Sequence, residues 1–257
     1  MLIDSHCHLH DREFFTEEQA LGMLERAVAA GVKKVICIGT SHEDSLTAYK
    51  FASEHENVYW TYGVHPENAS SQRKLEYDFS RDGVAFARRH GESAPHTSTP
   101  SGSSVGRRFG LESKLSDTQL LQRSVATSEI PREECSQLPI AIGEAGLDYH
   151  YEGYDREAQI RLFEEMLQLA RDNGLPVSFH VREAFDDFFP VVANFPGVRG
   201  VVHSFTDSKK KLKRILNETE FYVGVNGLAT YSTLPLPPLE RILLETDAPF
   251  LAPVPHR

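Results

Sequence analysis

The chain alternates short apolar segments with amphipathic ones, and this alternation constrains its fold more than any other feature. Eight apolar runs have the length and composition of buried β-strands. They cover residues 2–6, 33–39, 57–66, 138–148, 175–180, 198–204, 220–227 and 239–247. Helical patterns lie between most of them, at residues 16–31, 41–55, 155–174, 183–194 and 207–217. Strands that alternate with helices form parallel βαβ units. Eight such strands predict an α/β fold, a (β/α)8 TIM barrel rather than an open sheet.

The pattern is interrupted in two places. A polar insertion of about 91–137 separates the third and fourth strands, and its first part is rich in Ser, Pro, Gly and Thr. Such a composition is typical of a loop or flexible addition. Residues 229–241, between the seventh and eighth strands, hold three prolines, which predicts a shortened connection without a helix. We expect a single barrel domain over 1–257 that carries the insertion.

Composition limits the class of protein. The chain is 40% hydrophobic and 25% charged, as in ordinary globular proteins, and no apolar run approaches the roughly 20 residues of a membrane span. Three cysteines without CxxC spacing make a disulfide framework improbable and favour a cytoplasmic location. The net charge of −10 argues against a protein that coats nucleic acid, but not against an enzyme that holds nucleic acid at a cation-loaded site. No obligate protein partner is indicated.

Ionisable side chains stand at the ends of the predicted strands. His6 and His8 are two residues apart in "DSHCH" and would share one face of the first strand, whereas Cys7 would face the other way and pack. Later strands end at His65, Glu144, His180, His203 and Asp247, with Glu245 close by. The carboxyl ends of barrel strands meet at one mouth, where active sites of this fold lie. The pattern therefore predicts a metal site built from several strands.

The residue types narrow that site. Imidazole and carboxylate without thiolate suit divalent ions such as Mg, Mn and Zn. The six candidate ligands are His6, His8, Glu144, His180, His203 and Asp247. Six are too many for one catalytic ion that keeps an open position, so two ions that share a carboxylate fit better. Glu144, midway in strand order, is the candidate bridge. Two ions about 3.5–4 Å apart can activate water and stabilise both oxygens of a phosphoryl displacement.

The motifs taken together resemble those of the TatD family of metal-dependent hydrolases. The relevant segments are "DSHCHLH", "GVHPE", "IGEAGLDYH", "PVSFHVREA", "VVHSF" and "LLETDAPFLAPVPHR". The resemblance implies a TIM barrel of the metal-dependent hydrolase type with two divalent metal ions and deoxyribonuclease activity, commonly 3′-to-5′ on single-stranded DNA. It implies that one ion is held by His6, His8, Glu144 and Asp247 and the other by Glu144, His180 and His203. It also places His65 at a position associated with substrate phosphate.

The expected reaction is attack of an activated water on a terminal phosphodiester, with Asp247 as general base and Glu144 as the other catalytic carboxylate. Arg182 would contact phosphate, or would instead pair with Glu183 or Asp186. Tyr149 and Tyr151 could stack on a base or be ordinary loop aromatics. Two rival functions stay open: a metal-dependent ester hydrolase, such as a D-aminoacyl-tRNA deacylase, and a non-catalytic scaffold that bears metal.

Overall fold

A computed structural model describes residues 1–71, 75–78, 85–89, 138–231 and 233–256. The chain divides into two compact units, Met1–Gln72 with Ser136–Arg257, and Arg73–Cys135. In the second unit, β4 (Leu75–Asp78) and β5 (Ala85–Arg89) pair as an antiparallel ribbon that the alternating pattern does not predict. The insertion expected at 91–137 lies outside the described residues.

The first unit is built on eight strands. They are β1 (Leu2–Cys7), β2 (Val32–Cys37), β3 (Val58–Tyr62), β6 (Ala141–Asp148), β7 (Val177–Arg182), β8 (Gly200–Val202), β9 (Tyr222–Val225) and β10 (Ile242–Leu244). Neighbours pair in parallel in the order β1-β2-β3-β6-β7-β8-β9-β10. All eight predicted strands are present, each trimmed or shifted by a few residues. The predicted barrel is confirmed.

The first and last strands approach each other and nearly close the barrel. The backbone N–H of Asp247 donates to the carbonyl of His6, and the N–H of His8 donates to the carbonyl of Ala248, each at 2.8 Å. The side chain of Asp4 also accepts from the N–H of Thr246 at 3.0 Å. These bonds bring Asp247, three residues after β10, beside His6 in β1 and His8 just after it.

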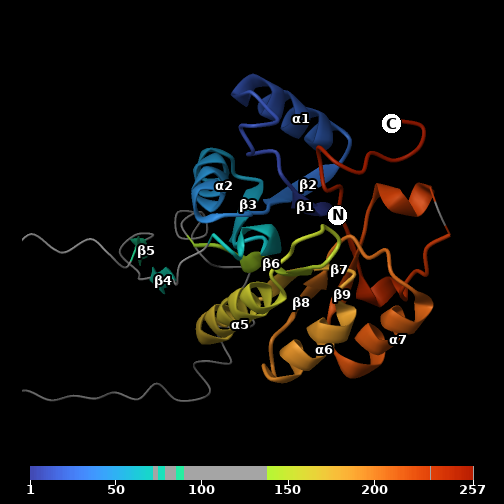
Figure 1. Ribbon diagram of the computed structural model, residues 1–257. Coiled ribbons are helices and arrows are strands. Elements are labelled where there is room, and N and C mark those ends of the chain that lie inside the picture. The colour runs from blue at the N-terminus through green and yellow to red at the C-terminus, as the bar shows by residue number, and fades with distance from the viewer. Residues whose placement is uncertain (72–74, 79–84, 90–137, 232, 257) are drawn as a thin grey trace, which may run out of the picture. The chain divides into compact units, whose positions relative to one another are not determined.

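The part of the chain that the structure describes holds five α-helices. They lie around the strands (Figure 1). They are α1 (Glu17–Ala29), α2 (His42–Glu54), α5 (Arg156–Asn173), α6 (Phe185–Ala193) and α7 (Lys209–Glu218), as the sequence pattern predicts. Thr16 and Gln19 form a capping box at the start of α1, and Ser41, Asp155 and Ser208 cap three of the others. Each cap satisfies an N–H group that has no partner inside its helix, so the helices begin where the sequence places these residues.

The β9–β10 connection carries two 3-10 turns, Gly227–Thr230 and Leu239–Arg241, and its described residues include no α-helix. The expected shortening is therefore present. Among the helices that the structure describes, none is long and apolar enough to span a membrane.

Aromatic rings fill the space between the barrel and its outer helices. Phe179 of β7 lies 5.3 Å from Phe188 of α6 and 4.6 Å from Phe221 at the start of β9, measured between ring centroids. Phe163 of α5 meets the same cluster at 5.8 Å from Phe188. These rings are almost fully buried. They fix β7, and with it His180, against the helices.

Candidate metal centre

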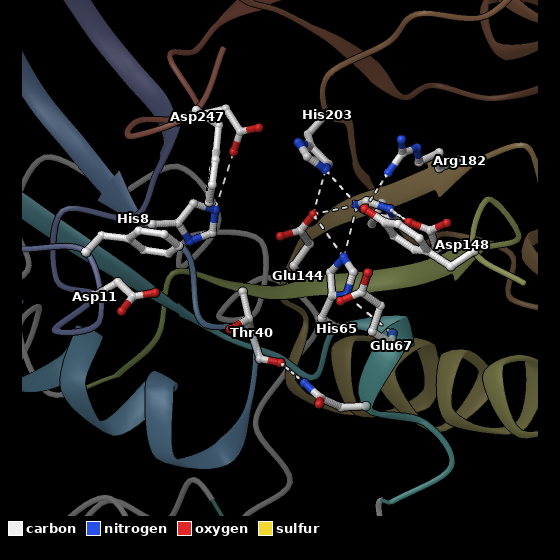
Figure 2. Close-up of a pocket in the computed structure, with 15 residues that line it drawn as sticks. His8, Asp11, Thr40, His65, Glu67, Glu144, Asp148, Arg182, His203 and Asp247 are labelled. Atoms are coloured by element: carbon white, nitrogen blue, oxygen red, sulfur yellow. Dashed lines mark hydrogen bonds and ion pairs between the residues drawn. The ribbon is translucent and has the colours of Figure 1, made fainter. Parts of the chain in front are cut away.

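The predicted ligands converge at one end of the barrel, around a cleft of about 420 Å³. Figure 2 shows two groups of side chains there, with Asp247 directed at His8 on one side and Glu144 directed at His203 and His65 on the other. Glu144 is 4% exposed and His6 is 1% exposed, so these two ionisable side chains are held away from bulk water. Burial of ionisable groups is costly unless they are paired or bind an ion.

The first group consists of His6, His8, Asp247 and one oxygen of Glu144. Nε2 of His6 and Nε2 of His8 lie 3.5 and 3.4 Å from Oδ1 of Asp247. Nε2 of His6 also lies 3.7 Å from Oε2 of Glu144 and, although it is buried, has no hydrogen-bond partner among the described residues. Bonds of about 2.0–2.2 Å to one ion set neighbouring donor atoms roughly 3–3.5 Å apart. The spacing of this group therefore fits a cation better than a hydrogen-bond network.

The two imidazoles of this group are oriented by contacts at their Nδ1 atoms. Nδ1 of His8 lies 3.1 Å from the carbonyl of Ile38, and Nδ1 of His6 lies 3.3 Å from the hydroxyl of Ser178. Each contact leaves Nε2 directed into the centre, as is usual for histidines that bind metal. Cys7, between them in sequence, is fully buried with its sulfur 3.4 Å from the carbonyl of Ile36, which agrees with the predicted packing role.

The second group is formed by the other oxygen of Glu144 with His180, His203 and His65. Oε1 of Glu144 lies 2.6 Å from Nε2 of His203 and 2.7 Å from Nδ1 of His180. Nε2 of His65 lies 3.4 Å from Nδ1 of His180 and 4.0 Å from the same carboxylate oxygen. The two oxygens of Glu144 thus face different groups, as a bridging carboxylate requires.

The histidines of the two groups differ in the direction of their pKa shifts, and each group contains both directions. Burial would lower the pKa of His203, but the carboxylate of Glu144 raises it to about 9. Burial and the neighbouring His203 hold the pKa of His6 well below its usual range. Burial and His180 lower the pKa of His65 to about 4. A raised pKa favours a proton on His203 beside Glu144, and a cation that binds there would displace it.

Asp148 is a member of the site that the sequence pattern did not single out. Its Oδ2 accepts from Nε2 of His180 at 2.8 Å, and its Oδ1 accepts from the backbone N–H of His150 at 2.9 Å. Residues four apart in a strand share a face, so Asp148 stands on the same face of β6 as Glu144. The four-residue spacing from Glu144 could have identified Asp148 from the sequence. The bond leaves Nδ1 of His180 free to face Glu144.

Glu245 binds the backbone of the residue that follows His203. Its Oε1 accepts from the backbone N–H of Ser204 at 2.6 Å, where the chain adopts a left-handed conformation with φ of 47°. Asn226 donates to the hydroxyl of Ser204 at 2.9 Å. Glu245 is thus directed at the loop that carries His203 and not at the two ligand groups.

The two predicted substrate contacts occupy different places. His65 lies among the second ligand group, so its imidazole could bind an ion as well as a phosphate. Arg182 lines the cleft, where its guanidinium lies 5.2 Å from the Tyr151 ring centroid and donates to the Tyr151 hydroxyl at 3.3 Å. The alternative pairings with Glu183 and Asp186 are not formed, because those carboxylates pair with His150 and Lys211.

The two tyrosines also differ. Tyr151 is 54% exposed at the cleft, whereas Tyr149 stacks on Tyr154 with a centroid distance of 4.5 Å and donates to Asp187 at 2.8 Å. Of the two, Tyr151 is therefore the one that is placed to meet a substrate. Tyr149 is held by its neighbours.

Residues 3–257, almost the whole chain, match the protein family described as TatD related DNase. The chain belongs to this family. TatD relatives include the uncharacterized metal-dependent hydrolase YcfH of Escherichia coli (strain K12), 26% identical over all of this chain and 80% of the relative. The 3'-5' ssDNA/RNA exonuclease TatD of Rahnella sp. (strain Y9602) is 29% identical over 92% of this chain and 75% of its own length. Among solved structures, the TatD homolog YJJV of Escherichia coli k12 aligns with a TM-score of 0.67 and 25% identity, over 97% of this chain and 80% of that one.

Proposed function

We propose that this TatD-family protein is a metal-dependent phosphodiesterase that removes nucleotides from the 3′ end of single-stranded DNA. The observation that carries the proposal is the position of the Glu144 carboxylate between the two groups. One of its oxygens faces His6, and the other faces His203 and His180. The name of the Rahnella relative supports the substrate and the polarity.

We propose that His6, His8, Asp247 and Glu144 hold one divalent ion, and that Glu144, His180 and His203 hold a second. Mg, Mn and Zn are the candidate ions, since the donors are imidazole nitrogen and carboxylate oxygen. When bound, the ions supply a more acidic water and positive charge for the phosphate oxygens.

Three side chains have further roles in the proposed reaction. The carboxylate of Asp247 is 14% exposed at the cleft, where it can accept the proton of the attacking water. Asp148 keeps the imidazole of His180 in one orientation. Arg182, held over Tyr151, offers its guanidinium to a phosphate of the bound strand.

The test uses single-stranded DNA labelled at its 5′ end, with Mg or Mn and then with a chelator. We expect a ladder that shortens from the 3′ end and stops when the chelator is added. Glu144→Ala removes the shared carboxylate and should abolish cleavage. Glu165→Gln, on the exposed face of α5, is the matched control and should cleave as the parent does.

The rival functions predict other results. Turnover of D-aminoacyl-tRNA without cleavage of DNA under any metal would identify an ester hydrolase. Tight metal binding without turnover of either substrate would identify a scaffold.

A further inference from the structure

Helix α7 carries a dense group of positive charges in an acidic chain. Five of the six residues at 209–214 are Lys or Arg, whereas the whole chain has a net charge of −10. Two of the five have partners. Lys211 pairs with Asp186, and Arg214 pairs with Glu218 at 2.7 Å and lies 3.9 Å from the Phe189 ring centroid.

The other three, Lys209, Lys210 and Lys213, form what we call the lysine patch. All three are exposed, and none has an ion pair within the part of the chain that the structure describes. Spacings of three and four residues put Lys213 beside both Lys210 and Lys209 on the helix surface. Like charges at these spacings repel, and positive charge in a first turn also opposes the helix dipole. The patch therefore does not stabilise the helix, and a bound polyanion would relieve the repulsion.

The lysine patch lies on the same rim of the barrel as the metal centre. Helices of this fold begin near the carboxyl ends of the strands that precede them. Lys209 is the sixth residue after His203, which lies in the centre, and six residues span at most about 20 Å. The Lys211–Asp186 pair joins the first turn of α7 to that of α6, which follows Arg182 along the chain.

A groove of about 670 Å³ runs beside the patch. Lys209 lines it together with Leu212, Leu234 and Leu236. The carboxylate in its lining, Asp207, accepts from the backbone N–H of Ser208 at the start of α7. The apolar side chains of this groove can contact the bases of a nucleic-acid strand, while the ammonium of Lys209 contacts one of its phosphates.

We propose that Lys209, Lys210 and Lys213 bind phosphates of a single-stranded nucleic acid several nucleotides to the 5′ side of the end held at the metal centre. The inference rests on the proposed nuclease function for the identity of the strand. The patch acts on affinity and on substrate length, and it takes no part in the chemistry.

The test compares two triple variants of the full-length protein that change the net charge equally. The patch variant is Lys209→Gln, Lys210→Gln and Lys213→Gln. The control variant is Arg26→Gln, Lys33→Gln and Lys50→Gln, which alters exposed residues of α1, β2 and α2. A melting temperature in each variant that is no lower than that of the parent excludes a folding defect.

The first measurement is the fluorescence anisotropy of a labelled 12-nucleotide DNA, with chelator present, at several salt concentrations. Each phosphate contact on a single strand contributes about 0.7 to the slope of log affinity against log salt, so the patch variant should lose about 2 from that slope. The control should keep the slope of the parent. The second measurement is trimming with Mn, where the patch variant should be slowed on the 12-mer and unchanged on a trinucleotide.

Three results would overturn the inference. An equal loss of slope in both variants would indicate a general charge effect. An unchanged slope in the patch variant would exclude phosphate contacts at these lysines. If the parent binds phosphatidylserine vesicles and the patch variant does not, while the two bind DNA equally, the patch belongs to a membrane-binding surface. A parent that binds DNA with the patch-dependent slope and cleaves none would instead refute the proposed function alone.

Discussion

Nε2 of His180 donates to Asp148 at 2.8 Å while Nδ1 of the same ring faces Glu144 at 2.7 Å. The ring is therefore held from both sides, with one nitrogen committed to a neighbouring carboxylate and the other directed into the second ligand group. A carboxylate behind a histidine fixes its tautomer and makes the facing nitrogen a better metal ligand.

The first prediction concerns this pair. Asp148→Asn should weaken divalent-ion binding by about 10–100-fold, because contacts of this kind typically contribute that much to metal affinity. Titration calorimetry with Mn on the metal-free protein measures the change. Asp172→Asn, on the exposed side of α5, is the control and should bind as the parent does. Equal affinity in Asp148→Asn and the parent would contradict the proposed role.

The second prediction concerns stabilisation by metal. A ligand that binds only the folded state at 100 times its Kd stabilises it by about 2.7 kcal/mol. We expect a chelator to lower the melting temperature and Mn to restore it. In His8→Ala the Mn-dependent rise should shrink, because the first group loses a donor 3.4 Å from Asp247. In His256→Ala, an exposed residue near the C-terminus, the rise should be that of the parent.

The third prediction concerns the backbone beside Glu144. A Cβ at Gly63 would lie 2.2 Å from the carbonyl carbon of Gly143 and 2.4 Å from the backbone nitrogen of Glu144. Gly63→Ala should therefore destabilise the fold by about 3 kcal/mol, the upper end for overpacking, and should weaken metal binding with it. In Gly22→Ala the new Cβ meets only the mobile end of Arg26 at 3.3 Å, inside helix α1. That control should gain about 0.5–1 kcal/mol. Urea unfolding of the two variants measures whether the free energy of unfolding falls in Gly63→Ala and rises in Gly22→Ala.

The fourth prediction concerns a buried pair beside the cleft. His10 is fully buried, and its Nε2 lies 3.0 Å from Oδ1 of Asp44. Burial would lower the pKa of His10, but Asp44 and the sulfur of Cys37 raise it to about 9. A raised pKa in the folded state stabilises the protein fully below the unfolded value of about 6.5, and this stabilisation is lost as the pH rises through 9.

Asp44→Asn should therefore cost about 1.5–3 kcal/mol near pH 6, the range for a hydrogen bond to a charged group, and progressively less as the pH rises from about 6.5 to about 9. Urea unfolding across this range measures the difference from the parent. Asp172→Asn should show no such trend. A cost for Asp44→Asn that stays constant from pH 6 to pH 10 would show that the charge of His10 is not involved.

Much of the fold and of the candidate site could be predicted from the sequence. Apolar periodicity is local, so the strands ending at His6 and His180 and the helix that Thr16 caps were recognisable from neighbouring residues alone. The convergence of the predicted ligands also followed, because parallel barrel strands bring their carboxyl ends to one mouth.

Tertiary structure decided which atoms meet. The register of β6 on β7 pairs Gly146 with His180 and Asp148 with Arg182, and it sets the carboxylate of Asp148 against the His180 ring. Arg182 meets Tyr151 instead of the carboxylates nearest to it in sequence. His65 lies within the second ligand group, although the family resemblance assigned it to substrate phosphate. Contacts of this kind depend on strand register and side-chain rotamers across segments far apart in the chain, and no local pattern encodes them.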